Sequence, residues 1–189
     1  MAARRLIWRA AQRFIDPERL VFIDETGVNT KMTRLYGRAP VGERLKASAP
    51  FGHWKTMTFV AALRLSGVTA PWVLDGPMDG DAFRTYVTHA LAPTLAPSDI
   101  VVMDNLPAHK VVGIGEAIAA RGAQLFYLPP YSPDMNPIEM AFAKLKALLR
   151  QNPARTIDTL WPRIGHLIDA FTPVECANYF QAAGYQHSL

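Results

Sequence analysis

The sequence predicts an α/β fold in which helices flank a mixed sheet. Three apolar runs, Leu20 to Ile23, Ile100 to Met103 and Leu125 to Leu128, are too short for helices. Continuous aliphatic runs of this length are typical of central strands that are covered on both faces. Amphipathic helical patterns separate and follow these runs. A chain of 189 residues is long enough for one domain with a substantial core.

Two further strands and a crossover complete the predicted sheet. Residues 56–65 and 68–74 flank the turn signal Ser66-Gly67, so we expect a hairpin there. Pro71 places the second of these strands at an edge of the sheet. Next along the chain we expect a helix from Asp79 or Gly80 to about Leu95. Between the strands at 100–103 and 124–128, a helix over residues 108–121 predicts a right-handed parallel crossover.

The last third of the chain is predicted to be helical. Pro129, Pro130 and Pro133 forbid regular structure, and Asn136-Pro137 is a favoured helix start, with Asn136 as the N-cap. Pro153 ends that helix, and two amphipathic helices follow over residues 156–171 and 172–183. We therefore divide the chain into a basic helical linker at residues 1–19, a core at 20–152, and C-terminal helices at 153–189 that pack on the core.

The first residues predict a short basic helix. Over residues 3–14 the apolar positions Leu6, Ile7, Ala10, Ala11 and Phe14 fall on one face, which we expect to be buried. Four arginines are spread over the remaining positions. This helix is either a linker that contacts DNA or the end of a connection to an upstream domain, and the sequence favours neither.

Three carboxylates from distant segments are predicted to converge. Asp24 and Asp104 each directly follow a buried strand, at the edge where open α/β sheets place their ligands. Glu139 falls in the first turn of the helix that begins at Pro137. Alone, it would be explained as a residue that stabilises the helix dipole. Glu25 should point away from Asp24, because successive strand residues face opposite sides, so at most it supports the site indirectly.

Clustered carboxylates repel one another, so such a group is costly without a cation. Hard oxygen ligands favour Mg²⁺ or Mn²⁺. Two such ions, roughly 3.5 to 4 Å apart, would activate a water or a 3′-hydroxyl and stabilise the leaving oxygen of a phosphodiester. Asp75, Asp79 and Asp81 also follow a strand and are rival ligands, although an edge strand and a helix cap explain them fully.

The motifs around these acids resemble a known family. The segments VFIDET, VVMDNLPAHK and YLPPYSPDMNPIEMAFAKLK, with 34 residues between Asp104 and Glu139, are similar to the catalytic domain of DDE transposases. The bacterial insertion sequence 630 family, in the superfamily of the mariner elements, is the nearest resemblance. It implies a ribonuclease H-like fold with a mixed five-stranded sheet. It also implies that Asp24, Asp104 and Glu139 are the catalytic, metal-binding triad.

The resemblance further implies metal-dependent cleavage of transposon ends and strand transfer into target DNA. The alternatives are another ribonuclease H-like endonuclease and an inactive DNA-binding remnant of a decayed element. Family members carry an N-terminal helix-turn-helix region, so we expect this chain to be a second-frame product that works with an upstream-frame product. We expect a homodimer or larger assembly on DNA, in the bacterial cytoplasm and associated with the nucleoid when bound.

Other residues are assigned to supporting and binding roles. Asn105 and His109 either orient a ligand or touch the scissile phosphate, or else make only local hydrogen bonds. The predicted DNA contacts are Lys31, Arg34, Arg38, Arg44, Lys46, Lys144 and Lys146. The first five lie in an irregular segment, where a short hairpin is plausible and an ordinary solvated loop is the alternative. A formal net charge of +4 and a pI near 9.4 agree with a polyanionic partner without establishing one.

Composition excludes some other classes. The single cysteine, Cys176, cannot form an internal disulfide and is expected to be a small core residue in a reducing compartment. No apolar run approaches the roughly 18 residues that span a bilayer, and the N-terminus lacks the apolar core of a signal peptide. We therefore expect a soluble protein without a membrane partner. His89 is expected at the surface.

Overall fold

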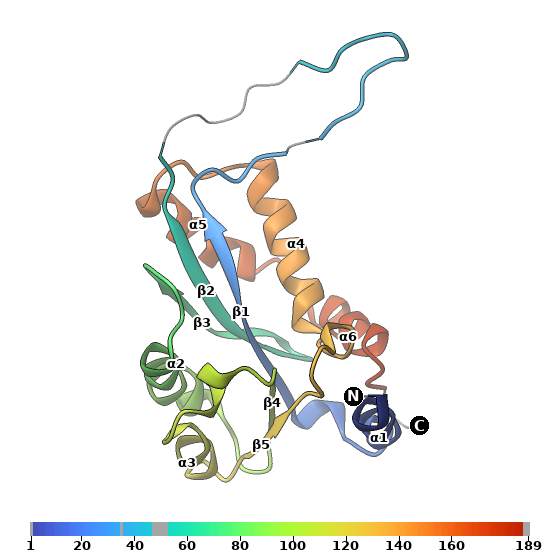
Figure 1. Cartoon of the computed structure of the whole chain (residues 1–189), viewed down its shortest axis with the longest axis vertical. Coiled ribbons are helices and arrows are strands. Elements are labelled where there is room, and N and C mark those ends of the chain that lie inside the picture. Colours follow the sequence, from blue (N-terminus) through green and yellow to red (C-terminus); the bar gives the residue numbers. More distant parts are fainter. Residues whose placement is uncertain (1, 35, 47–52, 187–189) are drawn as a thin grey trace.

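A computed structural model describes residues 2–34, 36–46 and 53–186, which contain one five-stranded sheet. The strands are β1 (Leu20–Asn29), β2 (Thr56–Arg64), β3 (Gly67–Leu74), β4 (Ile100–Met103) and β5 (Gln124–Tyr127). Their order across the sheet is β3-β2-β1-β4-β5. Pairs β1–β2 and β2–β3 are antiparallel, whereas β1–β4 and β4–β5 are parallel. The predicted mixed sheet is thus confirmed, with β1 at its centre (Figure 1).

The hairpin and the edge strand also agree with prediction. β2 and β3 join at Ser66-Gly67, and Gly67 has φ 144°, a conformation that glycine adopts readily. Pro71 is exposed on β3, an edge strand of the sheet, where its missing N–H breaks no ladder. Opposite it, the pairing with β2 shifts between Val60 and Ala62, which accommodates this irregular stretch.

The first strand is longer than predicted. The apolar run ends at Ile23, but β1 continues to Asn29 because its antiparallel partner β2 stays paired with it as far as Thr56. The parallel partner β4 pairs only with Leu20 to Ile23. Asp24 therefore lies in the middle of a strand, and the edge that we expected after it exists only on the β4 side.

Helices cover both faces of the sheet. On one face lie α4 (Ile138–Gln151), α5 (Ile157–Ile168) and α6 (Pro173–Ala182), whose buried residues share one core with Phe22, Phe59 and Leu63 of the sheet. On the other face lie α2 (Gly80–Tyr86) and α3 (Ile114–Ala119), packed with Val21 and Ile23. Thr172 caps α6 as expected, and Thr156 caps α5. Cys176 is fully buried in the first core.

Two predicted helices are interrupted. Asp79 caps α2, but the segment continues as a π-helix (Val87–Leu91) and a 3₁₀ turn (Ala92–Thr94). The helix predicted over residues 108–121 is instead a 3₁₀ turn, Pro107–Lys110, followed by the short α3. Gly113, with φ 98°, separates the two, because a left-handed residue cannot continue a right-handed helix.

The N-terminal helix α1 (Ala2–Gln12) packs on a different face from the one predicted. Leu6, Ile7 and Phe14 are 68%, 69% and 84% exposed. The helix is instead held by polar side chains: Trp8 Nε1 donates to Tyr185 Oη, and buried Gln12 donates to the carbonyl of Ala183. Specific hydrogen bonds to the end of α6 thus override the amphipathic pattern.

The segment between β1 and β2 extends away from the sheet (Figure 1). Its described residues from Thr30 to Lys46 contain turns but no helix or strand, and residues 47–52 of the predicted irregular segment lie outside the described part of the chain. Across the described residues, none of the helices has the length and apolarity needed to cross a bilayer.

The C-terminal helices should unfold together with the sheet. Phe22 of β1 is fully buried and contacts Phe180 and Tyr185, with ring centroids 5.4 and 4.9 Å apart. Phe22→Ala should lower the free energy of unfolding by about 3–5 kcal/mol, because a large buried ring leaves a cavity. Urea unfolding followed by circular dichroism measures this. Phe126→Ala, at a 43% exposed ring on β5, is the control and should cost much less. Two separate unfolding transitions in the wild type would contradict the expectation that the sheet and the C-terminal helices unfold as one unit.

Candidate active site

Asp24 is a buried carboxylate at the centre of the sheet. Its side chain is 8% exposed, because β2 and β4 flank its strand and helices cover both faces. The backbone N–H of Glu25 donates to Asp24 Oδ1 at 2.8 Å. Asn136 Nδ2 donates to Asp24 Oδ2, also at 2.8 Å. Both carboxylate oxygens thus have a fixed donor and a fixed direction.

Asp104 lies beside Asp24 because of the parallel register. Ile23 of β1 is paired with Met103 of β4, and the two aspartates are the next residues of these adjacent strands. The backbone N–H of Leu106 donates to Asp104 Oδ1 at 3.2 Å. The same oxygen lies 2.5 Å from His109 Nδ1. The convergence expected at this edge is therefore present for the two aspartates.

Glu139 completes the acidic lining of one pocket. It lies in the first turn of α4, is exposed to solvent, and lines a cavity of about 380 Å³ together with Asp24 and Asp104. Asn105 and Asn136 line the same cavity, whose remaining wall is the segment from Leu128 to Pro133. The rival acids Asp75, Asp79 and Asp81 are not among the lining residues.

His109 links Asp104 to Glu25. It is fully buried, its Nε2 lies 3.0 Å from Glu25 Oε2, and its ring stacks on Phe83 with centroids 4.1 Å apart. Burial by itself would lower the pKa of His109, but the hydrogen bonds and charges of Asp104 and Glu25 raise it to about 10. The imidazole is therefore charged at neutral pH. Glu25, on the opposite side of β1 from Asp24, reaches Asp104 only through this ring.

The surroundings of Asp24 disfavour its ionised form. Its pKa is raised to about 8, first by burial and then by the negative charges of Glu139, Glu25 and Asp104, against the hydrogen bond from the Glu25 N–H. A bound cation would reverse this effect, because opposite charge favours the ionised form. The ionised form of the buried Asp24 carboxylate is thus unfavourable unless a positive charge lies beside it.

The residues present fit a hard divalent cation. All the side chains that face the cavity with charge offer oxygen, the donor type that Mg²⁺ and Mn²⁺ prefer. Asn136 Oδ1 is buried and has no hydrogen-bond partner. As the side chains stand in residues 2–34, 36–46 and 53–186, no three His, Cys, Asp or Glu are close enough to share one ion. Asp24, Asp104 and Glu139 surround the cavity without meeting at a point, as mutually repelling groups would.

Some of the basic residues assigned to DNA line a groove at the C-terminal end of α4. Lys31 and Lys146 line one hollow with Arg150 and Trp54, where the Lys31 ammonium lies 4.1 Å from the Trp54 ring centroid. Arg34 lines a second hollow, which shares Arg150 with the first, together with Tyr36. Arg38, Arg44 and Lys46 are exposed on the extended segment. The groove thus lies at the opposite end of α4 from Glu139.

Lys144 is placed differently from Lys146. Its ammonium pairs with Glu175 Oε2 at 2.5 Å, donates to the carbonyl of Ala170 and lies 4.5 Å from the Phe171 ring centroid. These partners belong to the C-terminal region, on the far side of α4 from the groove lining. Its charge is already neutralised within the chain, so Lys146 and Arg150 are the better candidates on this helix.

Asn136 is the site residue that the sequence did not reveal. Asn136 was predicted to cap α4, but the N-cap position is Pro137, and no side chain caps the helix. The amide instead turns to Asp24, a residue 112 positions away in the chain. An Asn-Pro pair before a helix gives a strong local signal for a cap, so nothing in the sequence distinguished this second use.

Comparison with known proteins defines the class. Residues 19–161 match the family described as DDE superfamily endonuclease, so the chain belongs to this family. The match spans Asp24, Asp104 and Glu139. Among curated proteins, no sequence matches the chain significantly.

Solved structures of the Mos1 mariner transposase share the fold. Its paired-end complex with the left transposon end superposes with a TM-score of 0.74 at 16% identity, over 96% of this chain and 56% of that one. Its isolated catalytic domain gives a TM-score of 0.69 at 15% identity, over 96% and 83%. A paired-end complex with Mg gives 0.76 at 15% identity, over 96% and 58%. The chain spans little more than half of the transposase in its DNA complexes, and its fold is ribonuclease H-like, as expected.

The buried carboxylate should make stability depend on pH in an unusual direction. A raised pKa means that the folded state holds the proton more tightly than the unfolded state, whose Asp pKa is 3.8. The free energy of unfolding should therefore fall as pH rises between about 4 and 8, by at most about 1.4 kcal/mol per pH unit. Asp24→Asn should remove the part of this fall that Asp24 causes. In EDTA, the free energy of unfolding of Asp24→Asn should therefore exceed that of the wild type by an amount that grows up to about pH 8.

Chemical denaturation across this pH range, with chelator present, gives the two curves. Asp75→Asn, at an exposed acid outside the cavity, is the matched control and should run parallel to the wild type. Parallel curves for Asp24→Asn and wild type would show that Asp24 has no raised pKa.

Proposed function

We propose that this chain is the catalytic domain of a DNA transposase, which cuts DNA at transposon ends and joins the freed 3′-hydroxyl to target DNA. The observation that carries the proposal is one cavity that is lined by all three acids: the buried Asp24, together with Asp104 and the exposed Glu139. Membership of the DDE superfamily endonuclease family and the mariner-like fold support it. The resemblance of its motifs further favours the insertion sequence 630 family.

In this proposal Asp24, Asp104 and Glu139 hold a pair of divalent ions. The ions would supply a nucleophile at neutral pH and neutralise the leaving oxygen. The chain's own contribution is rigidity: the Glu25 N–H and Asn136 fix Asp24, whereas the Leu106 N–H and His109 fix Asp104. Glu139, exposed at the start of α4, is the ligand with freedom to move. The Mos1 paired-end complexes with Mg and with Mn support these two ions as the candidates here.

The buried charge of His109 has a role in this arrangement. The imidazole contacts Asp104 Oδ1 through Nδ1 and so limits the rotation of that carboxylate. Glu25 in turn compensates the buried positive charge. Both residues thus act on Asp104 through contacts, as ligand-supporting groups commonly do. Asn105, on the cavity wall, is placed to meet the substrate or a ligand.

We propose DNA as the partner of the groove formed by Lys31, Lys146, Arg150 and Trp54. Cations along one side of α4 suit successive phosphates, and Trp54 offers a stacking surface for a base. The Mos1 transposase has been solved with a transposon end and in a strand transfer complex, which supports the same substrate class. A homodimer or larger assembly, an upstream-frame helix-turn-helix product and a nucleoid location in the bacterial cytoplasm belong to the same proposal.

The first test is manganese-dependent nicking and joining. The substrates are supercoiled plasmid and a duplex carrying the repeat that flanks the gene. Asp104→Asn and Glu139→Gln should each lower nicking by at least about a thousandfold, because several kcal/mol of transition-state stabilisation are removed. The chain alone and its fusion to any upstream-frame product should be compared. Joined strands indicate a transposase, and cut strands without joining indicate another endonuclease. Full activity of Glu139→Gln would refute the triad.

The groove is tested by the salt dependence of DNA binding. Lys146→Glu should weaken binding about tenfold at low salt and reduce the slope of log affinity against log salt by about one, because one phosphate contact is lost. Arg121→Glu, the same charge change at an exposed residue beyond α3 on the other face of the sheet, is the control. Fluorescence anisotropy with a labelled duplex gives both slopes, and equal slopes for the two variants would exclude the groove.

A further inference from the structure

Asn136 immediately precedes Pro137, the N-cap residue of α4, and its side chain does not cap the helix. The residue is 3% exposed, and its backbone carbonyl accepts from the N–H of Glu139 at 3.3 Å. Its amide donates through Nδ2 to Asp24 Oδ2. The Asn136 side chain thus makes no local hydrogen bond with the helix. Its surroundings hold it instead for the contact with Asp24.

The other end of the same amide has no partner. Asn136 Oδ1 is buried and accepts no hydrogen bond from the described residues. Buried polar atoms without partners are rare in folded proteins, and each one needs an explanation, such as an ordered water or an ion. The residue lines the cavity shared by Asp24, Asp104 and Glu139. The amide thus meets the Asp24 carboxylate with its donor, at the wall of this cavity, although its own acceptor has no partner among the described residues.

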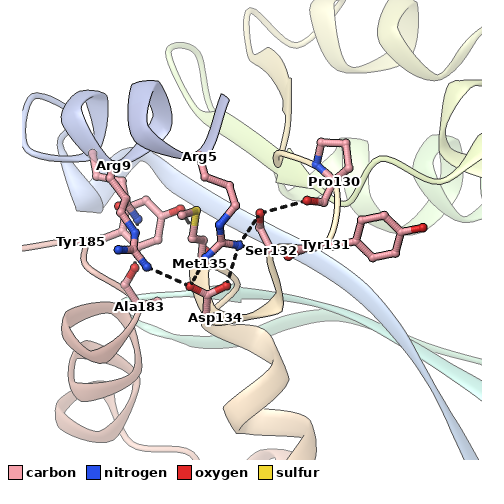
Figure 2. A network of polar contacts seen from close by, with 10 residues as sticks. Arg5, Arg9, Pro130, Tyr131, Ser132, Asp134, Met135, Ala183 and Tyr185 are labelled. Carbon is pink, nitrogen blue, oxygen red and sulfur yellow. Dashed lines mark hydrogen bonds and ion pairs between the residues drawn. The ribbon is translucent and has the colours of Figure 1, made fainter. Parts of the chain in front are cut away.

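The segment that carries Asn136 is fixed from both ends of the chain (Figure 2). Arg5 pairs with both carboxylate oxygens of Asp134, at 2.9 and 2.7 Å, and also donates to Ser132 Oγ and to the carbonyl of Tyr131. Tyr185 Oη donates to the carbonyl of Met135, the residue immediately before Asn136. Helix α1 and the end of α6 therefore grip the loop on both sides of Ser132–Asn136, which leaves the amide little freedom to turn away.

We propose that Asn136 is a positioning residue for a divalent cation at this site. Its Nδ2 orients the Asp24 carboxylate by donating to Oδ2, so that the other face of this carboxylate group is free to bind the cation. This inference rests on the proposed metal-binding function of Asp24, Asp104 and Glu139, and it adds a fourth side chain to that site. A neutral amide holds Asp24 in place without adding a further negative charge beside it, where Glu139, Glu25 and Asp104 already lie.

The test is the affinity for Mn²⁺, measured by isothermal titration calorimetry or by electron paramagnetic resonance of free Mn²⁺. Asn136→Leu keeps the volume but removes both the donor and the acceptor. Its dissociation constant for Mn²⁺ should rise about 10- to 100-fold, as when other supports of metal ligands are removed. Circular dichroism and the melting temperature in EDTA must show it folded at the assay temperature, because the loss of the donor to Asp24 Oδ2 should cost some stability. Asn136→Gln keeps the amide donor and should bind Mn²⁺ more tightly than Asn136→Leu.

Tyr131→Phe is the matched control, since it removes only a hydroxyl from an exposed side chain of the same loop. It should bind Mn²⁺ like the wild type. Equal weakening by Tyr131→Phe and Asn136→Leu would overturn the inference in favour of a general loop effect. Wild-type affinity in Asn136→Leu, with binding lost in Asp24→Asn, would overturn it while leaving the metal site intact. If the wild type and Asp24→Asn bind Mn²⁺ equally weakly, the proposed metal site itself fails.

Discussion

The burial of Asp24 is the constraint on which the rest of the structure depends. A carboxylate in the middle of a central strand is cut off from water by the sheet and its two helical layers, so its ionised form is costly. Nearby acids increase this cost. The surroundings respond with two directed donors, the Glu25 N–H and the Asn136 amide, which supply geometry without charge. Positive charge is what this arrangement lacks, and a divalent cation is the simplest group that would provide it.

The second aspartate shows how neighbouring strands can be used differently. Asp104 follows the end of β4, is less buried and is backed by His109, a charged imidazole that Glu25 stabilises in turn. The carboxylates of Asp104 and Glu25 are therefore separated by the imidazole of His109, whereas only acids are the charged neighbours of Asp24 among the described residues. A cation is thus needed most at Asp24, which lies between Asp104, held by its hydrogen bonds, and the exposed Glu139. One cavity is thus lined by two carboxylates with fixed hydrogen-bond partners and by one that is exposed.

The terminal segments of the described chain take part in this site at a distance. Helix α1 has the composition of a nucleic-acid-binding helix, yet Arg5 and Arg9 both pair with Asp134 (Figure 2). The loop between β5 and α4 contains four prolines and only one short 3₁₀ turn, Pro133–Met135, so few of its own backbone hydrogen bonds hold it. External contacts from α1 and from Tyr185 add to them. The position of Asn136 thus depends on residues that lie far from the cavity.

The sequence by itself determined the sheet, most helices and the identity of the three acids. Apolar runs of four residues and the Ser66-Gly67 turn are local signals, and local signals predict elements well. Asp24, Asp104 and Glu139 were identified because each sits in a short motif beside a recognisable strand or helix. Whether these three residues hold metal remains a prediction that the activity and binding experiments will decide.

Only the tertiary structure decided the length of β1, the face on which α1 packs and the partner of Asn136. Each depends on a contact between residues far apart in the chain. Pairing with β2 extends β1, and hydrogen bonds to Ala183 and Tyr185 set the orientation of α1. The Asn136 amide binds Asp24 and does not cap α4. A sequence pattern describes what a segment prefers when it is considered alone. Where a distant group offers a buried polar atom a better partner, that preference yields, because an unsatisfied buried carboxylate costs more than an uncapped helix.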